Sequence, residues 1–298
     1  MAKYSVGEYI YNVRKRKGYT QEELAEGICT TGTLSKIENG NRTPSYRIYE
    51  ALMQRLGEPA SLFSVYLGEK ELAADNFCRR VMRILARNEV EHPDILMEEY
   101  AAALMKYHLK ESPVMLCMKA ICHTMMQYPP QKVIEELLHA LQMTAPENME
   151  DWLKEKRKLF TFDEIMIWNN IAIQYKHMGQ PGRALHIWET LREYLHVREV
   201  DEEEKAKIFP VILYNLSGIY TQSNLYTEAV RYSEEGIQNC VEFGKLFPLP
   251  YLLHQKGEGL LALGEACLAE EYLSKSKLVL EIMKKKPAKI MEEMTAGF

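Results

Sequence analysis

The sequence of 298 residues contains no run of about 18 uncharged apolar residues, which is the length that a membrane-spanning helix needs. Residues 1–5 (MAKYS) lead directly into polar sequence, without the apolar core of a secretory signal. The six cysteines do not form any Cys-x-x-Cys pair, so we expect free and mostly buried thiols. These absences argue against a membrane span and against a secreted product, and they predict a cytoplasmic protein.

The short motifs of common enzyme sites are also missing. There is no nucleophile elbow, phosphate-binding loop or metalloprotease helix. Cys117, Cys122 and His123 lack the paired spacing of structural zinc ligands. Residues 257–262 (GEGLLA) formally match a dinucleotide-binding fingerprint, but no strand precedes them. We therefore predict no catalytic site, no metal and no cofactor.

Charge is distributed unevenly along the chain. Residues 1–66 carry nine Lys or Arg against seven Asp or Glu, whereas residues 67–298 carry 28 against 35. The overall charge of −5 therefore hides a basic segment, which includes residues 14–17 (RKRK). Such an asymmetry indicates one part that meets phosphate groups and another that does not. We accordingly predict two domains, residues 1–66 and residues 67–298.

Apolar residues recur at helical spacing almost everywhere, and stretches typical of strands are rare, so we expect an all-α protein. Four short helices are predicted in the first domain. The second of them begins at Thr20, where TQEE is a capping box. The third ends at residues 39–40 (NG), and the fourth begins near Pro44 and ends at Gly57.

The second domain contains a repeat of helix pairs. In each copy a small residue is followed by further pattern residues 3, 7, 12 and 16 positions later. The three copies are Ala172, Tyr175, Gly179, Ala184 and Trp188; Ser217, Tyr220, Asn224, Ala229 and Ser233; and Gly257, Leu260, Gly264, Ala269 and Leu273. This pattern is typical of two helices that cross closely at small residues, with Gly or Asn in a left-handed turn between them.

The copies begin 45 and 40 residues apart, so their helices are longer than those of the ~34-residue tetratricopeptide repeat. Two weaker pairs precede them, at about residues 70–108 and 112–143, with breaks at His92-Pro93 and at residues 128–130 (YPP). A short helix at about residues 286–296 should cap the stack. Residues 67–298 are thus predicted to form an α-solenoid of about five helix pairs.

Residues 18–45 (GYTQEELAEGICTTGTLSKIENGNRTPS) closely resemble the Xre/Cro-type helix-turn-helix. Joined to tetratricopeptide-like repeats, the whole chain resembles the peptide-responsive quorum-sensing regulators of Gram-positive bacteria, a group that includes PlcR-like and Rgg-like regulators. The resemblance implies a helix-turn-helix bundle followed by a right-handed α-solenoid. It also implies a DNA-binding homodimer that binds a short signalling peptide. One departure is that the stretch between Ala25 and Leu34 is one residue shorter than in the commoner Xre pattern.

In such motifs the first residues of the third helix enter the major groove of DNA. The candidates for base contact are Thr31, Gly32, Thr33 and Lys36. Threonine methyl groups suit thymine, and Lys36 can reach guanine, although a solvated lysine is the alternative. The candidates for phosphate contact are Arg14, Gln21, Asn39 and Arg42. Because Glu38 is acidic, we expect it to pair with Arg14 or Arg42 instead of contacting DNA.

In a solenoid of helix pairs, the first helices line a concave face. Counting back from the small residues of the repeat predicts which side chains line this concave face. They are Met166, Asn169, Ile173, Lys176, His177, Tyr214, Gly218, Gln222, Tyr251, His254 and Glu258. Asn169 is the most informative, because an amide side chain supplies both a donor and an acceptor to a peptide backbone. Asn170 and Asn215 occupy a site where asparagine commonly stabilises the repeat, and we favour that role for them.

The leading hypothesis is a DNA-binding transcriptional regulator that is controlled by a short signalling peptide. The alternative is a DNA-targeted adaptor whose repeats bind a protein partner. A narrow, partly apolar groove with buried amides favours the peptide, whereas a broad exposed surface favours a protein. Regulation through oligomerisation alone, without a ligand, also stays open.

Overall fold

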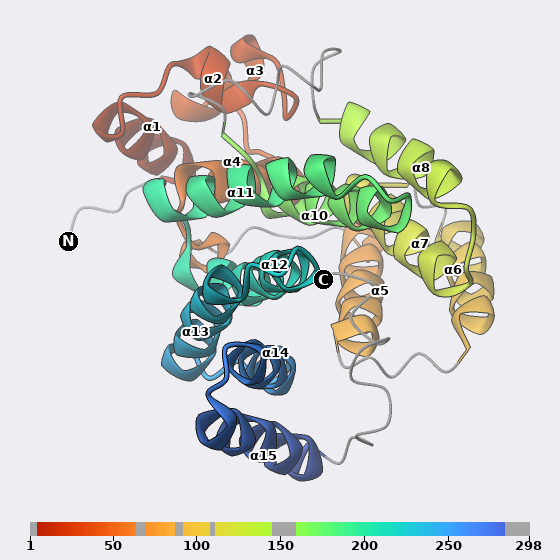
Figure 1. Cartoon of the computed structure of the whole chain (residues 1–298). Coiled ribbons are helices and arrows are strands. Elements are labelled where there is room, and N and C mark those ends of the chain that lie inside the picture. Colours follow the sequence, from red (N-terminus) through yellow and green to blue (C-terminus); the bar gives the residue numbers. More distant parts are fainter. Residues whose placement is uncertain (1–4, 64–68, 87–91, 108–110, 145–158, 284–298) are drawn as a thin grey trace.

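The computed structural model describes residues 5–63, 69–86, 92–107, 111–144 and 159–283. Within these ranges every regular element is a helix, which confirms the expected all-α class (Figure 1). No helix in them is both long and apolar enough to cross a membrane. The expected domain boundary after residue 66 and the expected capping helix at residues 286–296 lie outside the described residues.

Residues 5–63, here called the N-terminal bundle, contain four short α-helices. They are α1 (Val6–Arg16), α2 (Gln21–Ala25), α3 (Thr31–Glu38) and α4 (Tyr46–Leu56), followed by the 3₁₀ turn η1 (Ala60–Leu62). The expected capping box starts α2: the Thr20 hydroxyl accepts from the Glu23 N–H at 3.0 Å, and the Glu23 carboxylate accepts from the Thr20 N–H at 2.7 Å. Ile10, Leu24 and Leu34 are fully buried in the shared core of the bundle.

Residues 69–283 are here called the solenoid, and their described parts contain five helix pairs. The pairs are α5 (Glu69–Ala86) with α6 (Pro93–Tyr107), α7 (Pro113–Met125) with α8 (Pro130–Gln142), α10 (Phe162–His177) with α11 (Pro181–Val197), α12 (Glu202–Gln222) with α13 (Tyr226–Glu242), and α14 (Leu249–Ala262) with α15 (Ala266–Ile282). They follow one another along a curved path (Figure 1). The first helices of the last three pairs, α10, α12 and α14, contact each other in turn.

The small residues of the repeat lie where the two helices of a pair cross. The Ser217 hydroxyl donates to the carbonyl of Ala229 at 2.9 Å and lies 2.7 Å from the hydroxyl of Ser233. A Cβ on Gly257 would lie 2.7 Å from Cγ of Leu273, so any larger residue at this crossing requires the Leu273 side chain to move. The contact between the two hydroxyls accommodates a serine at position 233. The turn residues all have positive φ, at 69° for Gly179, 58° for Asn224 and 86° for Gly264.

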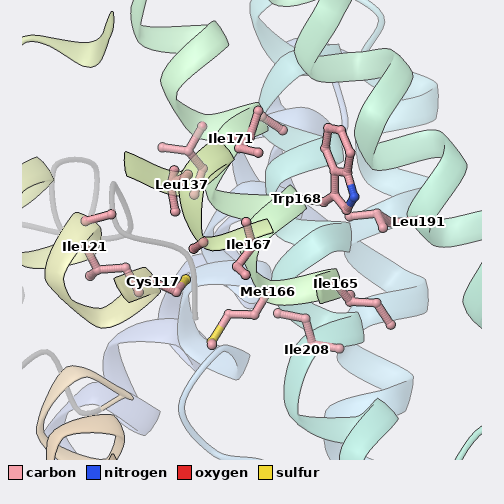
Figure 2. Close-up of a cluster of buried hydrophobic side chains, with 14 of the residues drawn as sticks. Cys117, Ile121, Leu137, Ile165, Met166, Ile167, Trp168, Ile171, Leu191 and Ile208 are labelled. Atoms are coloured by element: carbon pink, nitrogen blue, oxygen red, sulfur yellow. The ribbon is translucent and has the colours of Figure 1, made fainter. Parts of the chain in front are cut away.

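The main core of the solenoid surrounds α10. Side chains from α7, α8 and α10 meet there, including Ile121, Leu137, Ile167 and Ile171 (Figure 2). These four side chains are fully buried. Because α10 packs against α7, α8 and α11 at once, it is apolar on nearly every side. Little of its surface is consequently left for solvent.

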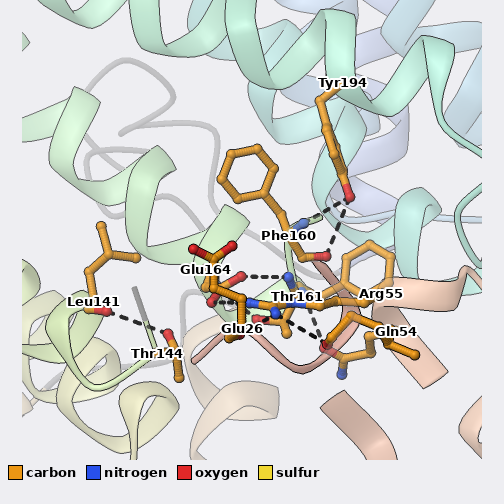
Figure 3. A network of polar contacts seen from close by, with 11 residues as sticks. Glu26, Gln54, Arg55, Leu141, Thr144, Phe160, Thr161, Glu164 and Tyr194 are labelled. Carbon is orange, nitrogen blue, oxygen red and sulfur yellow. Dashed lines mark hydrogen bonds and ion pairs between the residues drawn. The ribbon is translucent and has the colours of Figure 1, made fainter. Parts of the chain in front are cut away.

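The N-terminal bundle packs against the solenoid through the end of α4 and the start of α10. Arg55 donates to the Glu164 carboxylate at 3.2 Å, and both side chains are almost fully buried (Figure 3). The guanidinium also donates to the carbonyls of Leu24 and Glu26. Arg55 therefore joins α2, α4 and α10 at one point.

Glycine allows the backbones of the N-terminal bundle and the solenoid to approach closely. A Cβ on Gly27 would lie 1.6 Å from the carbonyl oxygen of Thr144, and a Cβ on Gly57 would lie 2.0 Å from that of Glu199. Both glycines also have positive φ, at 68° and 66°. The partner residues Thr144 and Glu199 follow two different helices, α8 and α11, so the bundle is docked at more than one point.

Candidate functional site

The beginning of α3 is open to solvent. The Thr30 hydroxyl caps the helix by accepting from the Thr33 N–H at 3.1 Å, which places the start of α3 at Thr31. Thr31, Gly32 and Lys36 are exposed, and Thr33 is half-buried. A Cβ on Gly32 would meet nothing nearer than the Thr30 hydroxyl at 4.0 Å. A ligand can therefore approach the backbone here closely.

A buried ion pair fixes α3 to the helices before it. Arg14 donates to the two carboxylate oxygens of Glu38 at 2.6 and 2.7 Å and to the carbonyl of Tyr19 at 2.9 Å. Gln21 donates to the same carboxylate at 2.7 Å. The expected pairing of Glu38 with Arg14 is confirmed. The network orients α1, α2 and α3 relative to one another, since bidentate arginine–carboxylate pairs have a fixed geometry.

This network bears on two of the predicted phosphate contacts and corrects one of them. Arg14 is only 3% exposed, so the prediction that it contacts phosphate is wrong. One N–H of the Gln21 amide is engaged by Glu38, and because the side chain is half-buried, its contact with a phosphate through the second N–H stays a prediction. In both cases the donors satisfy a buried carboxylate, which would otherwise be costly to desolvate.

The other phosphate candidates lie on the surface beyond α3. The Asn39 amide donates to the carbonyl of Ser35 at 2.9 Å and so helps to end the helix. Arg42 is exposed and forms no ion pair with any described residue. Lys36 and Arg42 thus remain the two exposed cations that flank the end of α3.

Four predicted positions of the concave face are buried. They are Met166, Asn169, Ile173 and Tyr251, with exposed fractions of 6%, 0%, 2% and 1%. The prediction that they line an open groove is wrong for this structure. For the three residues of α10, the physical reason is that neighbouring helices cover that helix on several sides. Tyr251 is covered by the rings of Tyr214 and Phe247, whose centroids lie 6.3 and 5.7 Å from its own.

Asn169 of α10 links three helices through buried hydrogen bonds. Its side-chain oxygen accepts from Trp188 of α11 at 2.9 Å and from Asn215 of α12 at 3.1 Å. Asn170 donates to the carbonyl of Met166 at 2.9 Å. Asn170 and Asn215 thus have the structural role that was favoured for them, and Asn169 shares it.

The remaining predicted positions are accessible. They are Lys176, His177, Tyr214, Gly218, Gln222, His254 and Glu258, which are half-buried or exposed. Burial lowers the pKa of Lys176, while burial and the charge of Lys176 together lower the pKa of His177. Burial raises the pKa of the Tyr214 hydroxyl. This face therefore combines a lysine with an imidazole and a phenol that are both neutral at neutral pH.

Gln255 was missed from the sequence although it lies on the same face, beside Gly218. The repeat contains a signal that could have found it. Counting 45 residues from Asn170 gives Asn215, and counting a further 40 gives Gln255. An amide side chain thus recurs at one repeat position in three successive inner helices.

The geometry of the N-terminal bundle agrees with a comparison to known families. Residues 10–63 match the family HTH_3, described as helix-turn-helix. This part of the chain is a helix-turn-helix domain. Its α2 and α3 are the two helices of the motif, and the open end of α3 belongs to the second of them. A search of curated proteins with the whole sequence gave no match.

Solved structures show the same fold over nearly the whole chain. PlcR of Bacillus thuringiensis, in complex with the peptide PapR7 and DNA, is 19% identical, with a TM-score of 0.62 over 94% of this chain and 95% of PlcR. Its apo form is 18% identical, with a TM-score of 0.55 over 94% of each chain. ComR from S. thermophilus, in complex with DNA and its signalling peptide ComS, is 13% identical, with a TM-score of 0.47 over 98% of each chain. The likeness to PlcR establishes a helix-turn-helix domain joined to a tetratricopeptide-like solenoid.

Proposed function

We propose that the protein is a sequence-specific, DNA-binding transcriptional regulator that acts as a homodimer and responds to a short peptide. The observation that carries the DNA-binding part is the exposed start of α3 in a domain of the helix-turn-helix family. The buried Arg14–Glu38 pair holds that helix in place. The solved PlcR complex, which has the same fold, contains both a peptide and DNA, and this supports the proposal.

The start of α3 is suited to a major groove. Thr31 and Thr33 carry methyl groups that can meet thymine, and Gly32 leaves room for close approach. Lys36 lies on the next turn of the helix, where it can reach guanine. One helix-turn-helix domain buries little surface, so two copies related by a two-fold axis would read an inverted repeat.

Replacing Lys36 with alanine should relax the preference for one base pair in each half-site, at a cost of about 1–3 kcal/mol on the cognate sequence only. Replacing Arg42 with alanine should weaken binding about equally on all sequences, because phosphate contacts position the protein without specifying bases. The measurement is fluorescence anisotropy with a selected operator and with random duplex. Equal losses on both duplexes for both variants would refute the assignment of Lys36.

The solenoid offers a route by which a peptide could act on DNA binding. A ligand that crosses α10, α12 and α14 touches several repeats, and in a solenoid this can change the pitch of the stack. The helix-turn-helix domain is docked on α10 through Arg55 and Glu164, so it would follow such a movement. The spacing of two such domains in a dimer would then change. By linkage, peptide and operator should alter each other's affinity by the same factor.

A further inference from the structure

Three inner helices converge at Gly218. This residue lies on α12, between Lys176 of α10 and Gln255 of α14. A Cβ on Gly218 would lie 3.1 Å from the Gln255 amide nitrogen and 3.8 Å from the Lys176 ammonium nitrogen. The ammonium group of Lys176 and the amide group of Gln255 therefore both lie over the backbone of α12 at Gly218, where there is no side chain. All three residues are half-buried, so this point is accessible from the concave face.

The polar groups at this point are not used by the protein itself. Among the described residues, the ammonium group of Lys176 forms no hydrogen bond or ion pair, and the side-chain oxygen of Gln255 is buried without a partner. Lys17 and Lys256, whose side chains are only 10% exposed, are both paired, Lys17 with Glu199 and Lys256 with Glu234. Burial lowers the pKa of Lys176, and no neighbouring carboxylate offsets this. A partly desolvated cation without a partner is expected to attract an anion from outside.

We propose that Lys176, Gln255 and the bare backbone at Gly218 form a subsite for a carboxylate group of the bound peptide. Lys176 donates to one carboxylate oxygen and the Gln255 amide donates to the other, and the absence of a side chain at Gly218 lets the Gln255 amide lie close to the backbone of α12. This inference rests on the proposed function, because it names the part of a peptide that the solenoid binds. The carboxylate is either the C-terminus of the peptide or an Asp or Glu side chain.

The surroundings of the subsite indicate what lies next to that carboxylate. Tyr214 precedes Gly218 by one helical turn on α12, and Tyr251 precedes Gln255 by one turn on α14. Their rings are in edge-to-face contact, with centroids 6.3 Å apart. The half-buried ring of Tyr214 gives the concave face an aromatic surface beside the carboxylate site. An apolar or aromatic residue of the peptide should therefore adjoin the carboxylate.

The test uses the full-length protein and three synthetic heptapeptide pools. One pool lacks Asp and Glu and has a free C-terminus, a second is the same pool with an amidated C-terminus, and the third is amidated but contains Asp and Glu. Capture is quantified by mass spectrometry. We expect the wild type to prefer the first or the third pool over the second by about tenfold, the effect of a charge-assisted hydrogen bond. The pool that is preferred identifies the source of the carboxylate.

Lys176→Met should remove this preference, whereas Lys277→Met, at an exposed lysine of α15, should keep it. Gly218→Ala is a second variant that retains the lysine. Alanine should favour α12 as a helix, but its Cβ would crowd the Gln255 amide, so this variant should also lose the preference. Equal capture of all three pools by the wild type, or a preference that survives both substitutions, overturns the subsite and leaves peptide binding standing. Capture of no peptide at all overturns the proposed function as well.

Discussion

Replacing Arg55 with methionine is expected to lower the free energy of unfolding by about 3–5 kcal/mol, because it leaves the Glu164 carboxylate buried without a counter-charge. The side chains of Arg55 and Glu164 are only 1% and 0% exposed. The substitution also removes the donors to the carbonyls of Leu24 and Glu26. Urea denaturation followed by circular dichroism measures the loss.

A double variant separates the buried charge from the lost contacts. In the capping box of α10, the Glu164 carboxylate accepts from the Thr161 N–H at 2.7 Å. Glutamine at position 164 keeps an oxygen that can accept this bond, but the glutamine side chain carries no charge. Arg55→Met combined with Glu164→Gln should therefore be more stable than Arg55→Met alone. If the double variant is no more stable than the single one, the unpaired carboxylate is not the source of the loss.

Gly27→Ala should destabilise the protein far more than Gly18→Ala, although the two glycines have nearly the same φ, at 68° and 73°. A Cβ on Gly18 meets nothing within 4 Å, so that variant shows only the left-handed strain, roughly 1–2 kcal/mol. A Cβ on Gly27 would overlap the Thr144 carbonyl, so the helix-turn-helix domain must shift away from the solenoid. Urea denaturation compares the stabilities, and small-angle X-ray scattering should show an expanded molecule for Gly27→Ala only.

Equal losses of stability in the two glycine variants, with unchanged scattering, would show that the close approach at Thr144 is not needed for docking. The expected outcome would instead show that the helix-turn-helix domain and the solenoid act as one body. That property matters for regulation, because a ligand on the solenoid can act on DNA binding only if the two domains are mechanically connected.

The features that the sequence predicted well depend on neighbours close in the chain. The capping box at Thr20 needs only a glutamate three residues later. The left-handed turn at Asn224 and the helix crossing at Ser217 follow from a spacing that recurs in successive repeats. Such signals are contained within about 20 residues, so the four helices of the bundle and the five pairs of the solenoid could be located from sequence.

The features that the sequence missed depend on packing between distant segments. The pairing of Arg14 with Glu38 was expected, but the sequence does not show that the pair is buried, and this burial removes Arg14 from the phosphate contact that was also expected of it. Asn169 was placed in a groove because it lies on the predicted inner face, but α7, α8 and α11 cover its helix. The Arg55–Glu164 pair joins residues 109 positions apart, and no local pattern marks it.

The central claim is that the open start of α3 reads a DNA sequence. The most direct measurement is selection of bound duplexes from a random double-stranded library at ~150 mM salt, where nonspecific phosphate binding is weak. The wild type should enrich an inverted repeat with half-sites about one helical turn, or a multiple of it, apart. The Lys36→Ala protein should enrich the same repeat with one position per half-site relaxed. A wild-type protein that enriches no sequence over the starting library would contradict the account.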